Sequence, residues 1–161
     1  WTCTGWLRPI RRSRISRGSG LQITDLLQIY RYVPSSNLPF VHGDLSYRII
    51  GILFDVYNEL GPGHREKYYQ KAVAEALRVA GIRFREQVYT PLIFRGRRIG
   101  AYYLDFLVES KVVIELKCGD RFSRRNIEQV YAYLKANGLA LGILVNFASD
   151  GVKLRRIVNI T

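Results

Sequence analysis

The spacing of apolar residues predicts two helices at the start of the main body. From Asp44 onward, apolar residues recur at the 3.6-residue spacing of a helix that buries one face. The first helix is predicted to start at Asp44, which can cap an N-terminus, and to stop at the GPG of residues 61–63. A second helix is predicted from about Arg65 to Ala80, with Gly81 closing it. The predicted inward positions are Leu45, Ile49, Ile52, Leu53, Val56, Leu60, Tyr69, Ala72, Val73, Ala76 and Leu77.

After Gly81 the pattern changes to that of strands. A basic RGRR turn at 95–98 separates the first two strands, and Pro91 is expected to break the first. Ser123 can cap a helix that runs to Ala136 and is closed by Asn137-Gly138. The element order is therefore α-α-β-β-β-α-β-β without internal repeats, which indicates a mixed α/β domain. The predicted strands cover 82–94, 99–108, 111–117, the continuously apolar run 139–147, which we expect to be buried on both faces, and 152–160.

Residues 1–43 differ from this body. They carry six arginines against the single acid Asp25, with serine, glycine and proline punctuation. We expect a basic N-terminal arm, either loosely ordered or in contact with phosphates, followed by one domain at 44–161. The chain contains no methionine, so Trp1 is not expected to be an ordinary translation start, and a fragment, a processed product or an unusual gene prediction is expected.

The charge of the chain favours a polyanionic partner. It has 25 Lys and Arg against 13 Asp and Glu, a formal net charge of +12. The body at 44–161 is basic by itself, with 19 basic and 12 acidic residues. Nucleic acid is the expected partner, although a basic chain can also lack one.

Several classes of protein are excluded by simple counts. Cys3 and Cys118 are the only cysteines, so a disulfide framework or a four-ligand zinc site is not available, and a reducing, cytoplasmic setting is expected. No apolar run approaches the roughly 18 residues of a membrane-spanning helix, so a transmembrane helix is excluded. The charge alone would also suit an anionic membrane face, but no membrane partner is predicted. The first 20 residues lack the apolar core of a signal peptide.

The stretch DFLVESKVVIELK, residues 105–117, places charged groups where a core is expected. Successive strand side chains point to opposite faces, so the odd positions put Asp105, Glu115 and Lys117 on one face. A turn centred on Ser110 would set Asp105 directly opposite Glu115, because opposed positions then sum to 220. The opposite face is predicted to be core, with Tyr102, Leu104, Phe106, Val108, Val112, Ile114 and Leu116.

Two opposed carboxylates suit a divalent cation. Cross-strand neighbours lie about 5 Å apart, where like charges are destabilising unless a cation lies between them. Mg²⁺ accepts one or two carboxylates, with water and substrate phosphate completing its octahedron. Lys117, on the same face, could hold or deprotonate an attacking water, or offset phosphate charge. The alternative is a solvated strand face with an ordinary Glu115–Lys117 pair.

The pattern of Asp105 followed by Glu115-Leu116-Lys117 resembles the PD-(D/E)xK nuclease superfamily. The stretch GHREKYY carries Gly63, Glu66 and Tyr69 in the G-x-x-E-x-x-Y pattern of the GxxExxY family, and QVYAY resembles the Q-x-x-x-Y motif of the RecB-type and lambda-exonuclease-like branch. The resemblance covers about residues 44–159, with Leu104 in place of the literal proline before Asp105.

The resemblance implies a restriction-endonuclease-like αβββαβ core, with a mixed central sheet flanked by helices, and Mg²⁺ or Mn²⁺ as cofactor. It implies Lys117, Glu115, Asp105 and Glu66 as catalytic residues, and Asp105, Glu115, Glu66 and the Leu116 carbonyl as metal ligands. Gln129 and Tyr133 are four residues apart, so they lie on one helix face, which is offset from the apolar stripe. The resemblance implies that they contact the substrate. The alternative is that they are polar positions at the edge of the core. The alternative for Glu66 is that it has no role at the metal and is simply a carboxylate in the first turn of a helix, where the helix dipole favours it.

Other chemistry-bearing residues receive simpler interpretations. Arg121, Arg124 and Arg125 oppose the dipole at the start of their helix, which favours a role in phosphate binding. Cys118 is expected to serve packing. His42 and His64 form no ligand pair and are expected to be structural.

These observations predict a metal-dependent nuclease that hydrolyses phosphodiester bonds, on DNA rather than RNA. One alternative is a catalytically dormant nuclease-fold module that binds nucleic acid within a larger complex. Another is a structural or oligomerising protein whose charge is incidental, and a homo-oligomer stays open. The sequence leaves endo- or exonuclease action, strand preference and pathway undecided.

Overall fold

The computed structural model describes residues 41–159. The predictions for the basic N-terminal arm therefore lie outside the described residues, apart from its last three positions. The first described helix, α2, spans Gly43–Leu60, and the residue before it is His42 in a left-handed conformation. Asp44 was predicted to cap this helix, but it lies in the first turn, where the helix dipole favours a carboxylate.

Helix α3 spans Glu66–Val79, and Ala80 is its C-cap residue. Gly81 follows with a φ of 66°. The two helices bury their apolar stripes largely as predicted. Ala74 is buried, whereas Ala72 and Ala76 are only half-buried. Leu60 was predicted to face inward but is 38% exposed, because it is the last residue of α2.

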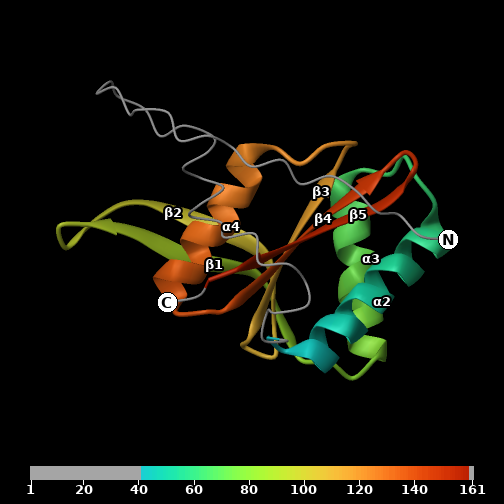
Figure 1. Ribbon diagram of the computed structural model, residues 1–161, viewed down its shortest axis with the longest axis horizontal. Helices are drawn as coiled ribbons and strands as arrows, with labels where there is room; N and C mark the ends of the chain where they lie inside the picture. Colours follow the sequence, from blue (N-terminus) through green and yellow to red (C-terminus); the bar gives the residue numbers. More distant parts are fainter. Residues whose placement is uncertain (1–40, 160–161) are drawn as a thin grey trace, which may run out of the picture. The chain divides into compact units, whose positions relative to one another are not determined.

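The five strands form one sheet in the order β1-β2-β3-β4-β5. Strands β3 and β4 are parallel and the other neighbours are antiparallel, so the sheet is mixed, as expected. Helices α2 and α3 pack on one face, and helix α4, Arg124–Asn137, packs on the other (Figure 1). The strands are Phe84–Phe94, Arg97–Val108, Val112–Cys118, Leu141–Ala148 and Gly151–Val158.

Strand β1 continues through Pro91, contrary to the predicted break. Pro91 pairs with Ala101 on β2. Because β1 is an edge strand, a proline that lacks the N–H donor can be accommodated there. The sequence alone did not place β1 at the edge.

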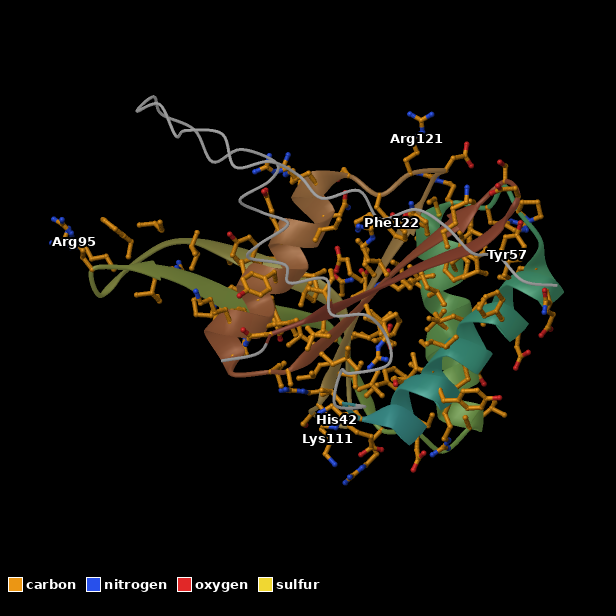
Figure 2. All side chains as sticks on the ribbon, viewed as in Figure 1. His42, Tyr57, Arg95, Lys111, Arg121 and Phe122 are labelled. Atoms are coloured by element: carbon orange, nitrogen blue, oxygen red, sulfur yellow. The ribbon has the colours of Figure 1, made fainter. Side chains whose placement is uncertain are left out.

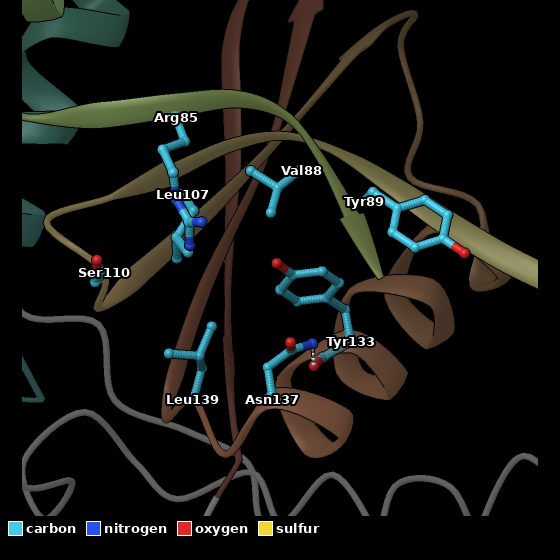
Figure 3. A pocket seen from close by; sticks show the side chains of 8 residues that line it. All are labelled: Arg85, Val88, Tyr89, Leu107, Ser110, Tyr133, Asn137 and Leu139. Atoms are coloured by element: carbon cyan, nitrogen blue, oxygen red, sulfur yellow. Dashed lines mark hydrogen bonds between the residues drawn. The ribbon is translucent and has the colours of Figure 1, made fainter. Parts of the chain in front are cut away.

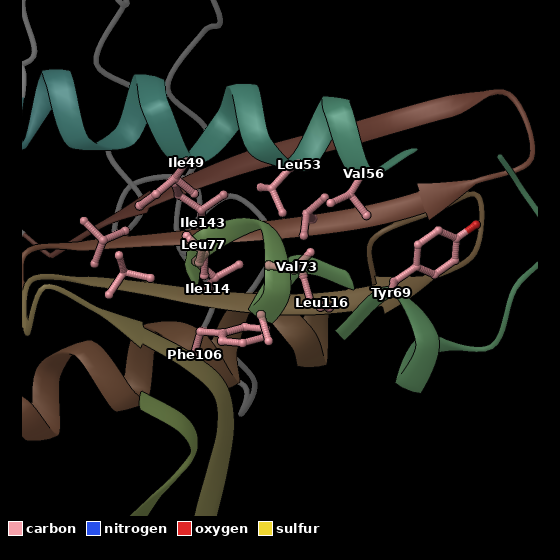
Figure 4. Packing of buried hydrophobic residues seen from close by; sticks show 14 of the residues in the cluster. Ile49, Leu53, Val56, Tyr69, Val73, Leu77, Phe106, Ile114, Leu116 and Ile143 are labelled. Atoms are coloured by element: carbon pink, nitrogen blue, oxygen red, sulfur yellow. The ribbon is translucent and has the colours of Figure 1, made fainter. Parts of the chain in front are cut away.

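Both faces of the central part of the sheet are buried, which changes the predicted assignment of faces. The cluster under α2 and α3 includes Phe106 and Ile114 (Figure 4), while Leu107 and Val113 belong to a second cluster under α4. Leu104 was predicted to share a face with Phe106 but belongs to the second cluster. The alternation of faces is therefore interrupted at the intervening residue of β2.

Helix α4 and strand β4 follow the sequence prediction closely. The Ser123 side chain caps α4 by accepting a hydrogen bond from Asn126 N, and Gly138 closes the helix in a left-handed conformation. All eight residues of β4 are buried, as predicted for a strand covered on both faces. Within residues 41–159, no helix is long and apolar enough to cross a membrane.

The β2–β3 turn places two residues with side chains at positive φ: Glu109 at 50° and Ser110 at 54°. Glu109 accepts hydrogen bonds from the backbone and guanidinium of Arg83 at 2.8 to 3.1 Å, which hold the pKa of its carboxyl below the usual range. The side chain of Ser110 is exposed. Ser110 is thus the position of this turn where glycine would relieve strain at least structural cost.

We expect Ser110→Gly to stabilise the protein by about 0.5–1 kcal/mol, because glycine adopts positive φ without a Cβ clash. Chemical denaturation with identical preparations would measure the change. Ser123→Ala serves as the matched serine control and should instead cost about 1 kcal/mol, since it removes the cap of α4. A loss of stability in Ser110→Gly would contradict the strain argument.

Candidate active site

The candidate site lies where β2 and β3 separate. The two strands are paired through Phe106 and Ile114, in the predicted register of positions that sum to 220. Beyond that pair, Asp105 Oδ2 accepts a hydrogen bond from Leu116 N at 2.7 Å. A side-chain carboxylate therefore takes the acceptor role that a strand carbonyl has elsewhere in the ladder, which accounts for the interrupted alternation.

Asp105 is held from two further elements. Gln70 on α3 and Gln87 on β1 each place Nε2 3.3 Å from Asp105 Oδ1. Burial raises the pKa of Asp105, while the hydrogen bond from Leu116 N opposes that rise. Sequence analysis did not identify either glutamine. Gln87 lies in β1 with a φ of 48°, and no local sequence pattern signals that conformation.

Glu115 is 4% exposed, and only one of its oxygens is paired within the described chain. Oε1 lies 2.8 Å from Lys117 Nζ, whereas Oε2 is buried without a hydrogen-bond partner. Burial, followed by repulsion from the Asp105 carboxylate, raises the pKa of Glu115 to about 7. A buried acceptor without a partner is costly unless a ligand satisfies it.

The Lys117 ammonium connects three of the oxygens predicted to bind metal. Its Nζ donates to the Leu116 carbonyl at 2.7 Å, and lies 2.8 Å from Glu115 Oε1 and 3.6 Å from Glu66 Oε1. Burial alone would lower the pKa of Lys117, but the hydrogen bond to Glu115 and the surrounding carboxylates raise it. Lys117 therefore carries its positive charge inside the candidate site.

Asn146 is a third residue that was not predicted from the sequence. It pairs with Lys117 in the β3–β4 register, is 1% exposed, and has a buried Nδ2 without a hydrogen-bond partner within the described chain. The signal was present in the sequence as the only polar side chain in the apolar run 139–147. A buried, partly unsatisfied amide beside Lys117 indicates a place where a polar ligand could bind.

The predicted metal ligands lie together, though not as a three-carboxylate cluster. Within residues 41–159, no group of three or more His, Cys, Asp and Glu side chains is arranged to hold a metal ion. Glu66 is at the N-terminus of α3, and its half-exposed side chain reaches the site through Lys117. Asp105, Glu115 and the Leu116 carbonyl form a donor set of the kind that Mg²⁺ accepts with water. The partnerless Glu115 oxygen fits this role.

The predicted substrate-binding residues of α4 fall into different surroundings. Arg125 and Gln129 line a cavity of about 610 Å³ between α4 and β2. Arg124 pairs instead with Glu128 at 2.7 Å. Arg121 lies in the exposed segment before α4 and points outward (Figure 2).

Tyr133 lies deeper than predicted, at 1% exposure in the cluster under α4. The expectation that it is offset from the apolar stripe is therefore wrong, because its ring packs with that stripe. The ring also borders a second cavity of about 320 Å³, together with Arg85 and Asn137 (Figure 3). Its proposed contact with substrate stays a prediction.

The remaining candidate residues have local contacts. His64 Nε2 lies 3.0 Å from the Leu60 carbonyl, and its ring contacts Tyr69 edge-on, which fits the expected structural role. Cys118 was expected to serve packing but is exposed, with Sγ 3.6 Å from the His64 carbonyl oxygen. His42 precedes α2, and among residues 41–159 it belongs to no group of side chains that could hold a metal ion.

Comparison with known proteins gives one family match. The family model described as the PD-(D/E)XK nuclease superfamily matches residues 43–157. No curated protein matches the chain. The crystal structure of SSO0001 is similar at 18% sequence identity and a TM-score of 0.43, and the match covers 92% of this chain and 71% of that one. The crystal structure of the alkaline exonuclease LHK-Exo from Laribacter hongkongensis is similar at 13% identity and a TM-score of 0.45, and the match covers 76% of this chain and 73% of that one. The narrower GxxExxY resemblance stays a prediction.

Proposed function

Because the chain belongs to the PD-(D/E)XK nuclease superfamily, we propose that it hydrolyses phosphodiester bonds of nucleic acid, with DNA as substrate and Mg²⁺ or Mn²⁺ as cofactor. The observation that carries the proposal is the buried Glu115 oxygen without a partner, beside the Asp105 carboxylate. This pair lies in a domain with net positive charge. A phosphate-rich substrate and a divalent cation would both be complementary to that arrangement.

In this proposal Asp105, Glu115 and the Leu116 carbonyl hold the cation, and Glu66 assists directly or through water. A bound Mg²⁺ would polarise the scissile phosphate and lower the pKa of a water molecule. Gln70 and Gln87 orient Asp105 through their hydrogen bonds to Oδ1. Such support keeps a metal-ligating carboxylate in one rotamer.

Lys117 is proposed to position the attacking water and to offset charge on the phosphate. The hydrogen bond of its Nζ to the Leu116 carbonyl and its ion pair with Glu115 hold the ammonium beside the proposed metal ligands. A charged ammonium stabilises negative charge that develops on phosphate oxygens. Arg124, Arg125, Gln129 and Tyr133 on α4, and Arg121 in the segment before it, are proposed to contact the substrate.

A catalytically dormant binding module is the second candidate. One observation favours it: Lys117 already neutralises Glu115 and contacts both Glu66 and the Leu116 carbonyl. Carboxylates paired in this way could persist without catalysis. Binding of nucleic acid that is unaffected by chelation, with no cleavage in any metal, would favour this candidate.

Removal of the metal tests the proposed reaction. We expect cleavage of supercoiled, linear or single-stranded DNA in Mg²⁺ or Mn²⁺, and none in EDTA, because the proposed metal activates the water. Gel analysis of the three substrates would also separate endo- from exonuclease action. In the absence of DNA, Mg²⁺ should raise the melting temperature of the wild type but not of Asp105→Asn, since binding stabilises only a folded site. Cleavage that persists in EDTA would contradict the proposed cofactor.

A further inference from the structure

Strands β1 and β2 extend beyond the rest of the sheet as a two-stranded arm. Residues 88–104 form this arm. Within the described residues, its two strands pair only with each other, since the β2–β3 ladder starts at Phe106. Figure 1 shows the arm reaching away from the other strands, past α4. A ribbon of this kind has little core of its own, so its exposed side chains call for another explanation.

The charge of the arm has one sign. Residues 88–104 contain no Asp or Glu and three arginines: Arg95, Arg97 and Arg98. Arg95 lies at the far end of the arm (Figure 2), and its guanidinium stacks 5.3 Å from the Phe94 ring centroid. A cationic tip without acidic neighbours is complementary to a polyanion.

Exposed aromatic rings connect the arm to the candidate active site. Tyr103 is 58% exposed and Tyr89 is 42% exposed, and their rings make an edge contact at 5.4 Å. The two tyrosines are register partners on neighbouring strands. Tyr103 comes two residues before Asp105, and Tyr89 two residues after Gln87, which contacts that carboxylate. The aromatic pair therefore adjoins the proposed metal ligand along the ribbon.

A cavity joins the base of the arm to α4. Tyr102 and Tyr103 line one side of the cavity of about 610 Å³, and Arg125 and Gln129 line the other. Rings from β2 thus share one space with the Arg125 guanidinium, the Gln129 amide and Glu128, whose carboxylate is paired with Arg124 at 2.7 Å. Binding sites for single strands combine aromatic rings, on which bases stack, with cations, which bind phosphates.

Resting on the proposed function, we propose that the arm binds the substrate as a single strand, with a base stacked on Tyr103 and phosphates on Arg95 and Arg97. Arg98 donates to the Tyr89 hydroxyl at 3.1 Å and so supports the ring pair. Stacking selects a single strand, because the bases of a duplex already stack on each other and cannot offer a face to a tyrosine. The exposed rings beside Asp105 therefore favour single-stranded nucleic acid as the substrate class.

A second copy of the chain fits this surface less well. Two arms brought together would juxtapose their arginine tips, and no acid on either arm would offset the repulsion. A single nucleic-acid strand supplies the negative charge that the arm lacks, and bases that can stack on its exposed rings. Dimerisation through the arm is therefore an outcome that would overturn the proposal.

The test measures binding of a dye-labelled single-stranded oligothymidine of about 16 nucleotides, by fluorescence anisotropy in EDTA. We expect Tyr103→Ala to weaken binding by about 5- to 150-fold, and Tyr103→Phe to restore most of the affinity, because the phenyl ring still stacks. Tyr47→Ala, which removes an exposed tyrosine on α2, should have no effect. The wild type should bind the same strand more weakly when it is paired with its complement.

The double variant Arg95→Ser/Arg97→Ser should reduce the slope of log affinity against log salt by about 1.4, as expected for two phosphate contacts on a single strand. Lys111→Ser, at the β2–β3 turn away from the arm, is the charge control (Figure 2). Equal binding by Tyr103→Ala and wild type, tighter duplex binding, or a change of oligomeric state in the arm variants would overturn the proposal.

Cleavage assays keep this proposal distinct from the proposed function. Cleavage that depends on Glu115, together with single-strand binding that is insensitive to Tyr103→Ala, would overturn the arm proposal alone. Binding that depends on Tyr103 without any Glu115-dependent cleavage would overturn the nuclease proposal alone. Circular dichroism melts of each variant confirm that the protein compared is folded.

Discussion

Replacing Glu115 by glutamine is expected to reduce metal-dependent cleavage by at least about 100-fold while the protein stays folded. Glutamine preserves the size of the side chain and one carbonyl oxygen, but it removes the negative charge that would bind the cation. Of the two adjacent carboxylates, Asp105 and Glu115, only Asp105 would then remain at the proposed metal site. Initial cleavage rates at saturating Mg²⁺, with wild type and variant purified identically, would measure the loss.

The stability of Glu115→Gln separates a catalytic effect from a folding defect. The Glu115 carboxylate is buried with its pKa raised to about 7, which means that the fold disfavours its charged form. In EDTA at pH 8 the variant should therefore melt at or above the wild-type temperature. Glu59→Gln, an exposed position on α2, is the matched control and should leave both rate and melting temperature unchanged. Wild-type cleavage rates in Glu115→Gln would contradict the proposed active site.

The register of the β2–β3 hairpin could be predicted because it depends on local information. The turn at Ser110 fixes which positions oppose each other, and apolar residues on both sides confirm the pairing through Phe106 and Ile114. The break in alternation at Asp105 could not be predicted in the same way. It depends on the Asp105 carboxylate, which accepts the hydrogen bond from Leu116 N in place of a backbone carbonyl. The spacing of apolar and polar residues does not predict such a bond.

Features that depend on neighbours distant in sequence were also missed. Pro91 suggested a break, because the sequence does not state that β1 lies at the sheet edge. Tyr133 was placed beside the apolar stripe of α4, yet its ring is buried in the cluster under that helix. Gln70 and Gln87 come from two elements that converge on Asp105 only in the folded chain. In each case tertiary packing, rather than local propensity, determined the outcome.

The charged residues of the hairpin were identified for a sound reason, although their burial was underestimated. The odd face was predicted to hold a metal site, with a solvated strand face as the alternative. In the folded chain Leu107 and Val113 on that face are core, and Glu115 is almost fully buried. The electrostatic cost of that burial is what makes the site chemically distinctive, since desolvated carboxylates bind cations more strongly than exposed ones.

Replacing Tyr69 by alanine is expected to destabilise the protein by about 3–5 kcal/mol, a large part of the roughly 5–15 kcal/mol of a typical domain. The Tyr69 ring is fully buried and stacks on Phe147 of β4 at 4.2 Å. Its hydroxyl donates to the Gly61 carbonyl at 2.6 Å, at the end of α2. In the G-x-x-E-x-x-Y stretch, Glu66 thus reaches the candidate site, and Tyr69 holds the α2–α3 connection against the sheet.

Two further variants divide the effect of Tyr69 between its ring and its hydroxyl. Tyr69→Phe keeps the stack on Phe147 but leaves the Gly61 carbonyl without its donor, so it should cost only about 1 kcal/mol. Tyr47→Ala, on the exposed face of α2, should change stability by less than about 0.5 kcal/mol. Urea titrations would measure all three. If Tyr69→Ala were no less stable than Tyr69→Phe, the ring would not hold α3 to β4, and the position of Glu66 would need another explanation.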